Sequence, residues 1–250
     1  MKIGFFDSGM GGLTVLHEAL RLLPHERFVY FADSQHAPYG NKPKQQIKQY
    51  VFEAVRFMAT QDLKALVVAC NTATSIAIDE LREQFEFPIL GMEPAVKPAV
   101  NSVANKRVLV FATELTLREA KFKKLVSVVD THRQVDYIPL QELVVMAEQF
   151  TFDESVILPY LQHKLAHLDL TQYGAMVLGC THFPYFKKFF RQLIPADIQL
   201  IDGSVGTVNH LKNVLANNLT TQGESEVEYY ISKEKTDAGL FEKYLTLLDE

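Results

Sequence analysis

The chain contains the same series of four short apolar segments twice. In the first half these are residues 2–7, 28–33, 65–70 and 87–91, and in the second half residues 107–113, 134–140, 175–181 and 197–204. Matching segments start 105, 106, 110 and 110 residues apart. One such pair could arise by chance, because buried strands have similar compositions. Four pairs in the same order, with a cysteine at the same place in the third, predict two related halves.

Stretches with helical spacing separate these segments. Apolar residues recur three and four positions apart in residues 13–23 and 45–60, and a third such stretch, 74–84, follows a strand closely. Strands that alternate with helices form mostly parallel sheets. We therefore predict an α/β fold of two pseudo-symmetric lobes, each a mostly parallel sheet flanked by helices. Ligands of such sheets bind beyond the carboxyl ends of the strands, so we expect the active site in the cleft between the lobes.

Composition excludes several classes of protein. A chain of 250 residues with 48% hydrophobic content can bury a sizeable core. The net charge is −5 and neither half has a basic surplus, so we expect no nucleic-acid partner. The start lacks the long apolar stretch of a signal peptide, and other apolar runs are too short to cross a bilayer. We expect a cytoplasmic protein with no membrane partner.

Two cysteines, Cys70 and Cys180, are the only ones in the chain, which excludes a disulfide framework and a four-thiolate zinc site made by one chain. Each could be a small buried hydrophobic residue, a common role for cysteine. Cys70, however, ends a predicted strand and begins a helix, where free N–H groups and the helix dipole favour the thiolate and lower the thiol pKa. Asn71 and Thr72 then either cap that helix or bind a substrate carboxylate.

The second cysteine stands in the segment Gly179-Cys180-Thr181-His182. His182 lies two residues beyond the thiol, close enough to share or hold its proton. The alternative is a histidine with a core or capping role. If the lobes face each other, the two thiols flank one cleft from opposite sides, which suits a nearly symmetric proton transfer.

A glycine-rich turn, residues 7–12, follows the first predicted strand. Its backbone could approach an anion closely. It lacks the Lys-Ser/Thr pair of a P-loop and the GxGxxG spacing of a dinucleotide site, so we expect no nucleotide. Asp7 could accept a proton or orient Cys70, or it could cap the helix. The segment 38–40 follows the second strand and is compatible with a simple turn.

Two histidines, His163 and His167, are four residues apart on a predicted helix and could share a metal ion. No third ligand can be placed beside them. We therefore expect a solvated helix face and no metal site.

Five motifs in order, DSGMGGLTV, the segment 33–40 ending in PYG, CNTA, GMEPAVKPA and GCTHFP, resemble those of glutamate racemases of the aspartate/glutamate racemase superfamily. The resemblance spans almost the whole chain. It implies exchange of L- and D-glutamate without pyridoxal phosphate or another cofactor, by a two-base mechanism that in bacteria supplies D-glutamate for peptidoglycan. A homodimer is compatible with the sequence but does not follow from it.

The resemblance also implies roles for individual residues. Cys70 would act on D-glutamate with help from Asp7, and Cys180 on L-glutamate with help from His182, with Glu148 as a further catalytic candidate. The residues that match substrate-binding positions are Ser8, Tyr39, Gly40, Asn71, Thr72, Thr113, Thr116 and Thr181. The first lobe would comprise residues 1–93 plus 209–250, and the second residues 94–208.

Four positions in the second half depart from the family pattern. Glu119 and Phe122 replace the usual serine and tyrosine, and Val145 and Phe150 replace the usual proline and glycine. These changes leave the assignment of Glu148 and the fit of the substrate side chain open. An aspartate or broad-specificity racemase remains an alternative, because one methylene changes binding by only about 1–3 kcal/mol. A low-activity regulatory protein on the same fold and a redox thiol pair are further alternatives, although the cysteines do not form a C-x-x-C motif.

Overall fold

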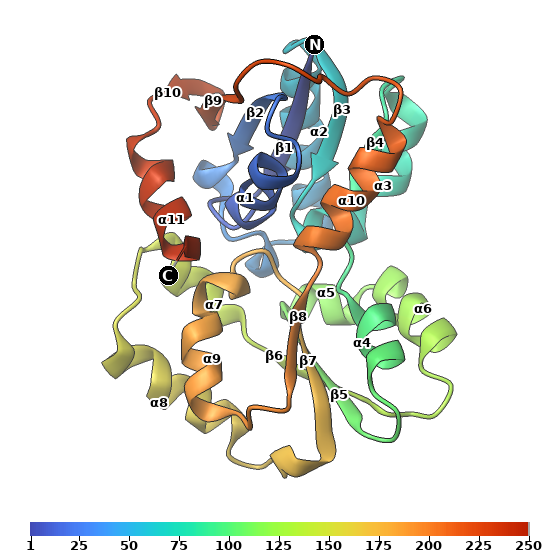
Figure 1. Cartoon of the computed structure of the whole chain (residues 1–250), viewed down its shortest axis with the longest axis vertical. Helices are drawn as coiled ribbons and strands as arrows, with labels where there is room; N and C mark the ends of the chain where they lie inside the picture. The colour runs from blue at the N-terminus through green and yellow to red at the C-terminus, as the bar shows by residue number, and fades with distance from the viewer. Residues whose placement is uncertain (250) are drawn as a thin grey trace.

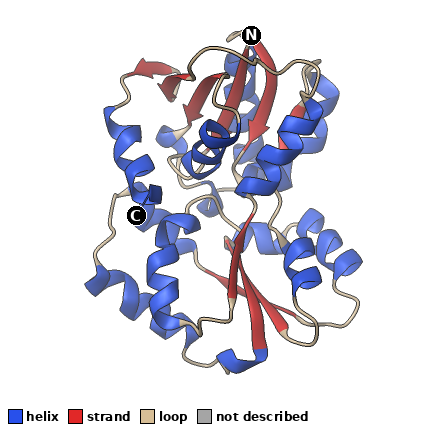
Figure 2. Ribbon diagram, viewed as in Figure 1, coloured by secondary structure: helices blue, strands red, loops and turns tan. Residues whose placement is uncertain are grey.

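Two β-sheets, one in each lobe, organise the molecule, a computed structural model that describes residues 1–249 (Figure 1). The first sheet has the strand order β10-β9-β2-β1-β3-β4 and the second β6-β5-β7-β8. Figure 2 shows helices around both sheets, which confirms the predicted α/β class. The strands are β1 (Lys2–Asp7), β2 (Arg27–Ala32), β3 (Leu63–Val68), β4 (Ile89–Gly91), β5 (Arg107–Ala112), β6 (Val135–Pro139), β7 (Tyr173–Leu178), β8 (Gln199–Asp202), β9 (Glu226–Ile231) and β10 (Glu234–Thr236).

The repeat seen in the sequence is a repeat of topology. The order β2-β1-β3-β4 in the first sheet corresponds strand for strand to β6-β5-β7-β8 in the second, and all of these pairs are parallel. Even a register shift recurs, between Lys2 and Ile3 in β1 and between Arg107 and Val108 in β5. Each of the strands β1 to β8 lies within a few residues of its predicted segment. The carboxyl ends of β3 and β7, which precede the cysteines, therefore occupy equivalent positions in the two lobes.

Helices cover both faces of each sheet, so the strands are apolar on both sides. Phe5 and Phe6 are adjacent in β1 and both fully buried, yet they belong to different cores. The helices are α1 (Leu13–Leu22), α2 (Lys44–Ala59), α3 (Asn71–Gln84), α4 (Val96–Ser102), α5 (Glu114–Arg118), α6 (Ala120–Val129), α7 (Gln141–Glu148), α8 (Glu154–Leu165), α9 (Lys187–Leu193), α10 (Ser204–Val214) and α11 (Gly239–Asp249), with short 3₁₀ turns η1 (Ser34–His36), η2 (Tyr39–Asn41), η3 (Leu170–Gln172) and η4 (Phe183–Phe186).

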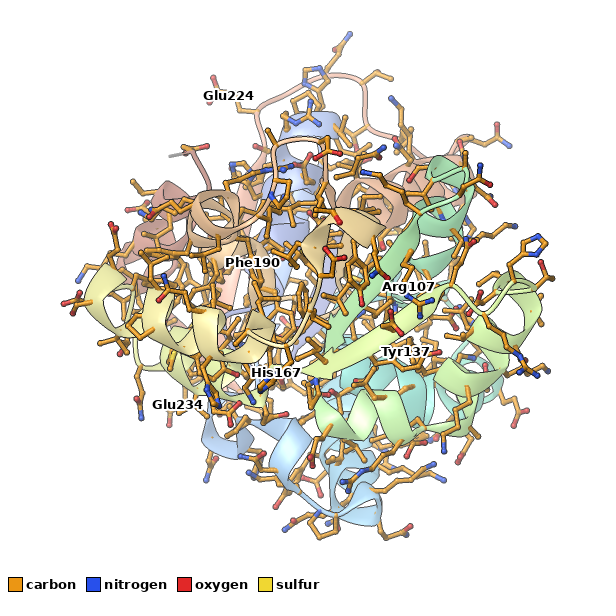
Figure 3. The ribbon with its side chains drawn as sticks, turned by 90° about the horizontal axis from the view of Figure 1, so that it is seen from below. Arg107, Tyr137, His167, Phe190, Glu224 and Glu234 are labelled. Carbon is orange, nitrogen blue, oxygen red and sulfur yellow. The ribbon has the colours of Figure 1, made fainter. Side chains whose placement is uncertain are left out.

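One apolar core runs through both lobes. It joins α1, α10 and α11 of the first lobe's side to α7, α8 and α9 of the second, and it includes Phe5 and Phe111 from the two sheets. Phe190, labelled in Figure 3, lies inside this core with its ring 5.1 Å from that of Phe111. Arg107 and Tyr137, also labelled, lie on the neighbouring strands β5 and β6 of the second sheet. The shared core fixes how the two strand ends face each other.

The C-terminal segment returns to the first sheet, where β9 pairs in parallel with β2 and β10 pairs antiparallel with β9. The apolar segments of the sequence did not reveal these two strands, because β9 and β10 are rich in charged residues. Helix α10 contacts α1 and β4, so the chain returns to the first lobe at about Ser204 (Figure 1). The lobe boundaries stay a prediction. None of the helices formed by residues 1–249 is long and apolar enough to span a membrane.

Candidate active site

Both cysteines lie two residues beyond the end of a central parallel strand, Cys70 after β3 and Cys180 after β7. Cys70 caps α3, whose first turn presents the N–H of Ala73 to Sγ at 3.4 Å. The Cys70 thiol lies 3.6 Å from the hydroxyl of Ser8, which follows β1. Both sulfurs are buried, with exposed fractions of 5% for Cys70 and 6% for Cys180. The two thiols therefore lie at the strand ends where the sequence repeat predicts them.

The protonation state expected for Cys70 is wrong. Burial raises the pKa of the Cys70 thiol to about 12, and the nearby charge of Asp7 adds to the rise. The N–H of Ala73 lowers the pKa as the sequence suggested, but it does not outweigh the loss of water around the sulfur. Burial and the charge of Asp7 thus favour the thiol form of Cys70 over the thiolate.

Cys180 has the opposite surroundings. Its sulfur lies 3.7 Å from Nδ1 of His182, and Nε2 of the same ring lies 2.5 Å from Oε1 of Glu148. Burial lowers the pKa of His182, but its hydrogen bonds to Cys180 and Glu148 hold that pKa well above its ordinary value. A protonated imidazole donates from both nitrogens, so the His182 ring faces the Cys180 sulfur on one side and the Glu148 carboxylate on the other.

Glu148 belongs to this group despite the departures from the family pattern around it. Its Oε1 also accepts the backbone N–H of Met10 at 2.8 Å. Burial would raise the pKa of Glu148, but the bonds from His182 and Met10 keep it below its ordinary value. Because the carboxylate comes from α7 and Met10 from the turn after β1, this contact joins the two lobes.

The glycines of the 7–12 turn make room for that contact. A Cβ at Gly9 would lie 2.0 Å from Oε1 of Glu148, and one at Gly11 would lie 2.4 Å from Nδ1 of His182. The turn was predicted to approach an anion closely, and the anion in the structure is the carboxylate of Glu148. Tyr30 and Tyr185 hold the turn by donating to the carbonyls of Gly9 and Met10 at 2.7 and 2.8 Å. Neither tyrosine was predicted to belong to the site, although a tyrosine within a buried strand such as β2 signals a need for a hydrogen-bond acceptor.

Asp7 lies between the cysteine groups and is fully buried. Its Oδ1 accepts the N–H of Gly9 at 2.9 Å and its Oδ2 accepts the hydroxyl of Thr181 at 3.0 Å, so it contacts the second lobe directly. Burial raises the pKa of Asp7 to about 6, while the charge of His182 opposes the rise. Asp7 acts on Cys70 through its charge, since its hydrogen bonds go to Gly9 and Thr181. The charge of Cys180 also raises the pKa of Cys70, which brings the two sulfurs into one electrostatic environment.

Polar side chains gather where the start of α3, next to Cys70, meets the end of β5 and α5. Thr72, Thr113 and Thr116 form a triangle of hydroxyls with Oγ1–Oγ1 distances of 2.9 to 3.2 Å. Thr72 comes from α3, whereas the other two come from the end of β5 and from α5. Asn71 donates its amide to the carbonyl of Met92 at 2.9 Å, and its Oδ1 is buried without a partner among residues 1–249. The site therefore retains a buried acceptor and a cluster of hydroxyls drawn from both lobes.

Tyr39 and Gly40 form part of η2, which contacts α3 and α5. The hydroxyl of Tyr39 donates to Oδ2 of Asp33 at 2.6 Å, and His36 contacts the same carboxylate at 2.9 Å. Asp33 was not predicted as part of the site, although it begins the 33–40 segment. The structure thus places Tyr39 and Gly40 beside α5 and beside α3, the helix that begins after Cys70.

Three of the four departures make contacts outside this group of residues. Glu119 pairs with Lys44 at 2.6 Å across the lobes, and Phe122 packs its ring 5.7 Å from that of Tyr137. Phe150 adopts a positive φ of 54° beyond α7 and packs against Tyr244. These three changes therefore introduce one ion pair and two ring contacts.

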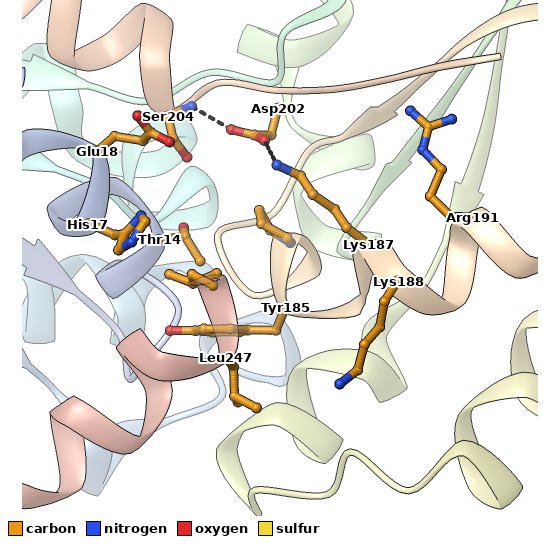
Figure 4. A pocket seen from close by; sticks show the side chains of 12 residues that line it. Thr14, His17, Glu18, Tyr185, Lys187, Lys188, Arg191, Asp202, Ser204 and Leu247 are labelled. Carbon is orange, nitrogen blue, oxygen red and sulfur yellow. Dashed lines mark hydrogen bonds and ion pairs between the residues drawn. The ribbon is translucent and has the colours of Figure 1, made fainter. Parts of the chain in front are cut away.

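Two other features lie apart from the cysteines. A cavity of about 260 Å³, drawn in Figure 4, is lined by side chains that include Thr14, Lys187 and Asp202 and by neither cysteine. His163 lies in α8 and His167 beyond its end, and no group of three or more potential metal ligands gathers within residues 1–249.

Comparison with known proteins agrees with this geometry. The sequence model of the Asp/Glu/hydantoin racemase family matches residues 14–211. The chain is 53% identical to a glutamate racemase of Halothermothrix orenii, with both chains covered in full, and 51% identical to glutamate racemase 2 of Bacillus subtilis, with 100% of this chain and 96% of that relative covered. A solved structure of Escherichia coli glutamate racemase, in complex with L-glutamate and the activator UDP-MurNAc-ala, has a TM-score of 0.84 at 28% identity and covers 97% of this chain and 95% of its own. The resemblance of the five motifs is confirmed, and the chain belongs to the Asp/Glu/hydantoin racemase family of isomerases.

Proposed function

We propose that this protein interconverts L- and D-glutamate without a cofactor, using Cys180 and Cys70 as base and acid on opposite faces of the α-carbon. The observation that carries the proposal is the contrast between the surroundings of two chemically identical thiols. One is kept as a thiol by burial and the charge of Asp7, and the other contacts a protonated imidazole. Such divergent environments are the pattern by which acid and base roles are recognised.

The proposed reaction starts from the protonation states described above. The Cys180 thiolate takes the α-proton of L-glutamate as the C–H bond breaks and an S–H bond forms. The electron pair left on the α-carbon then takes the proton of the Cys70 thiol from the opposite face. The products are D-glutamate and an enzyme in which Cys70 is the thiolate and Cys180 the thiol. Reaction of D-glutamate by the reverse path restores the first form.

The α-proton of an amino acid is very weakly acidic, so the site must stabilise a carbanion-like transition state. The pre-placed hydroxyls of Thr72, Thr113 and Thr116 suit the charge that develops on the substrate's α-carboxylate. The free Oδ1 of Asn71 suits the substrate's ammonium group. A buried site strengthens each of these contacts, because little water competes for them. Ser8, Tyr39, Gly40 and Thr181 complete the proposed substrate-binding set.

The cellular role follows from the family resemblance. We infer that the D-glutamate produced in the cytoplasm supplies peptidoglycan synthesis. Two lobes, residues 1–93 plus 209–250 and residues 94–208, would carry the two thiols to one substrate. The oligomeric state, including a homodimer, is a separate proposal that activity alone does not test.

The test is isotope exchange in heavy water with no added cofactor. L-Glutamate or L-aspartate is incubated with the intact protein, and loss of optical rotation and entry of deuterium at the α-carbon are followed together. We expect both with glutamate. Faster reaction of aspartate would reassign the substrate, and silence toward both acidic amino acids would reject the proposed activity.

A further inference from the structure

Gln141, the first residue of α7, carries a buried amide without a partner. Neither its Oε1 nor its Nε2 has a hydrogen-bond partner among residues 1–249, although both atoms are buried. The other buried side-chain atoms in this state are the oxygens of Ser34, Asn71 and Ser204. Gln141 therefore provides the one unpartnered nitrogen donor within that part of the chain. A buried amide left unpaired is unfavourable, so such a group is expected to meet a ligand or water.

The amide faces the turn that carries Gly40. A Cβ at Gly40 would lie 2.3 Å from Oε1 and 2.8 Å from Nε2 of Gln141, so the amide packs directly against the turn at Gly40. The same turn holds Tyr39, whose pKa is raised by burial and also by the charges of Cys70 and Asp7. Gln141 therefore reaches the edge of the site from the second lobe and lies opposite Gly40 of the first lobe.

The helix itself links Gln141 to the catalytic groups. Glu148 stands seven residues later on α7, and seven residues are close to two helical turns, so both side chains project from one face. Two turns correspond to about 10 Å along the axis. Glu148 contacts His182 at one end of this face, and Gln141 contacts the Gly40 turn at the other. This face of α7 therefore extends from His182, the neighbour of the Cys180 sulfur, to the turn at Gly40.

We infer that Nε2 of Gln141 donates a hydrogen bond to the side-chain carboxylate of the acidic amino acid and so selects glutamate over aspartate. The inference rests on the proposed function. With the α-carboxylate beside the three threonines and the ammonium beside Asn71, the side-chain carboxylate is the one charged group of glutamate that still needs a donor. Aspartate is one methylene shorter, so its carboxylate reaches Gln141 less well.

The variant Gln141→Leu tests this directly. Leucine has a similar volume, and its introduction breaks no hydrogen bond within residues 1–249, so the melting temperature should stay unchanged or rise. Loss of one hydrogen bond to a charged group should raise KM for glutamate about tenfold or more. We expect kcat to change by less, and the preference for glutamate over aspartate in kcat/KM to fall by a similar factor. Gln141→Glu, which places a second carboxylate there, should raise KM further.

The matched control is Gln162→Leu, an exposed glutamine of α8. It should leave KM, kcat and the glutamate preference unchanged. An unchanged KM in Gln141→Leu, or equal losses of kcat/KM for glutamate and aspartate, would overturn the role of Gln141 while leaving the racemase activity intact. Failure of the unaltered protein to react with either acidic amino acid would instead reject the proposed function and, with it, this role.

Discussion

The charge of Glu148 is expected to set the protonation state of the Cys180 side of the site. The variant Glu148→Gln removes that charge and keeps an oxygen that can accept from both the His182 ring and the N–H of Met10. The geometry should therefore persist while the stabilisation of the imidazolium is lost. His182 is 2% exposed and Glu148 is 16% exposed, so water screens this pair little.

The magnitude follows from a buried, charge-assisted hydrogen bond. Such a bond stabilises the imidazolium by about 1.5–3 kcal/mol relative to no bond, and the neutral amide oxygen of the introduced glutamine restores part of that energy. A net loss of about 2 kcal/mol corresponds to a fall of about 30-fold in kcat/KM, and the pKa of His182 should fall because the charge that stabilises the imidazolium is gone. Because the folded-state pKa of His182 is raised, the imidazolium is present below it and lost as pH rises through it. The alkaline limb of the pH profile should thus move to lower pH.

The assay measures kcat/KM for L- and D-glutamate separately across the range from neutral to alkaline pH. The two enantiomers have the same free energy in water, so kcat/KM must fall equally in both directions. An alkaline limb that stays in place, or a variant with full activity, would refute the role given to the Glu148 charge. Urea unfolding of the same variant checks that the fold is retained.

Three further variants test separate parts of the site. The variant Asp7→Asn removes a buried charge. Folding raises the pKa of Asp7 from 3.8 to about 6, so ionisation of Asp7 lowers the free energy of unfolding as pH rises through that interval, by about 3 kcal/mol in all. Urea unfolding should show the variant to be more stable at pH 8 and little changed below pH 4, with faster alkylation of Cys70 because its pKa falls; equal stability changes at both pH values would contradict this. Tyr39→Phe removes the hydrogen bond to Asp33 and should lower the free energy of unfolding by about 1 kcal/mol. It should affect catalysis mainly through a higher KM, whereas a lower kcat with unchanged KM would argue against a binding role. Gly12→Ala places a Cβ 2.6 Å from Cβ of Asp7 and should cost about 1–3 kcal/mol by overpacking, and an unchanged unfolding midpoint would show that the turn is not tightly packed.

Much of the fold could be predicted because its main signal is periodic. Apolar segments buried on both faces identify parallel strands, and their repetition in the same order gave two lobes with matching topology. Charged residues interrupt the apolar pattern of both β9 and β10, so these strands were missed. In addition, β9 pairs with β2, which is about 200 residues away in sequence. Pairings at such distance leave no local pattern.

The strand-end positions of the two cysteines could be predicted from the sequence, but the electrostatics around Cys70 could not. The strand-to-helix location of Cys70 suggested an easily formed thiolate, yet the pKa depends on how completely the opposite lobe excludes water and on the charge of Asp7. Likewise, the local departures around Glu148 made its role uncertain, because sequence does not show that its carboxylate reaches His182 and Met10. Gln141 carries no sequence signal at all. Its unpaired amide becomes visible only once the Gly40 turn is packed against it.

The most direct test of the two-thiol account is the stereochemistry of exchange in single-cysteine variants. In heavy water, Cys70→Ala retains Cys180 and should introduce deuterium into L-glutamate without inverting it, whereas Cys180→Ala should do so only for D-glutamate. Neither variant should racemise either enantiomer. The intact protein should introduce deuterium into both enantiomers and racemise both. Racemisation by either alanine variant, or exchange of both enantiomers by the same variant, would contradict the assignment of one sulfur to each face.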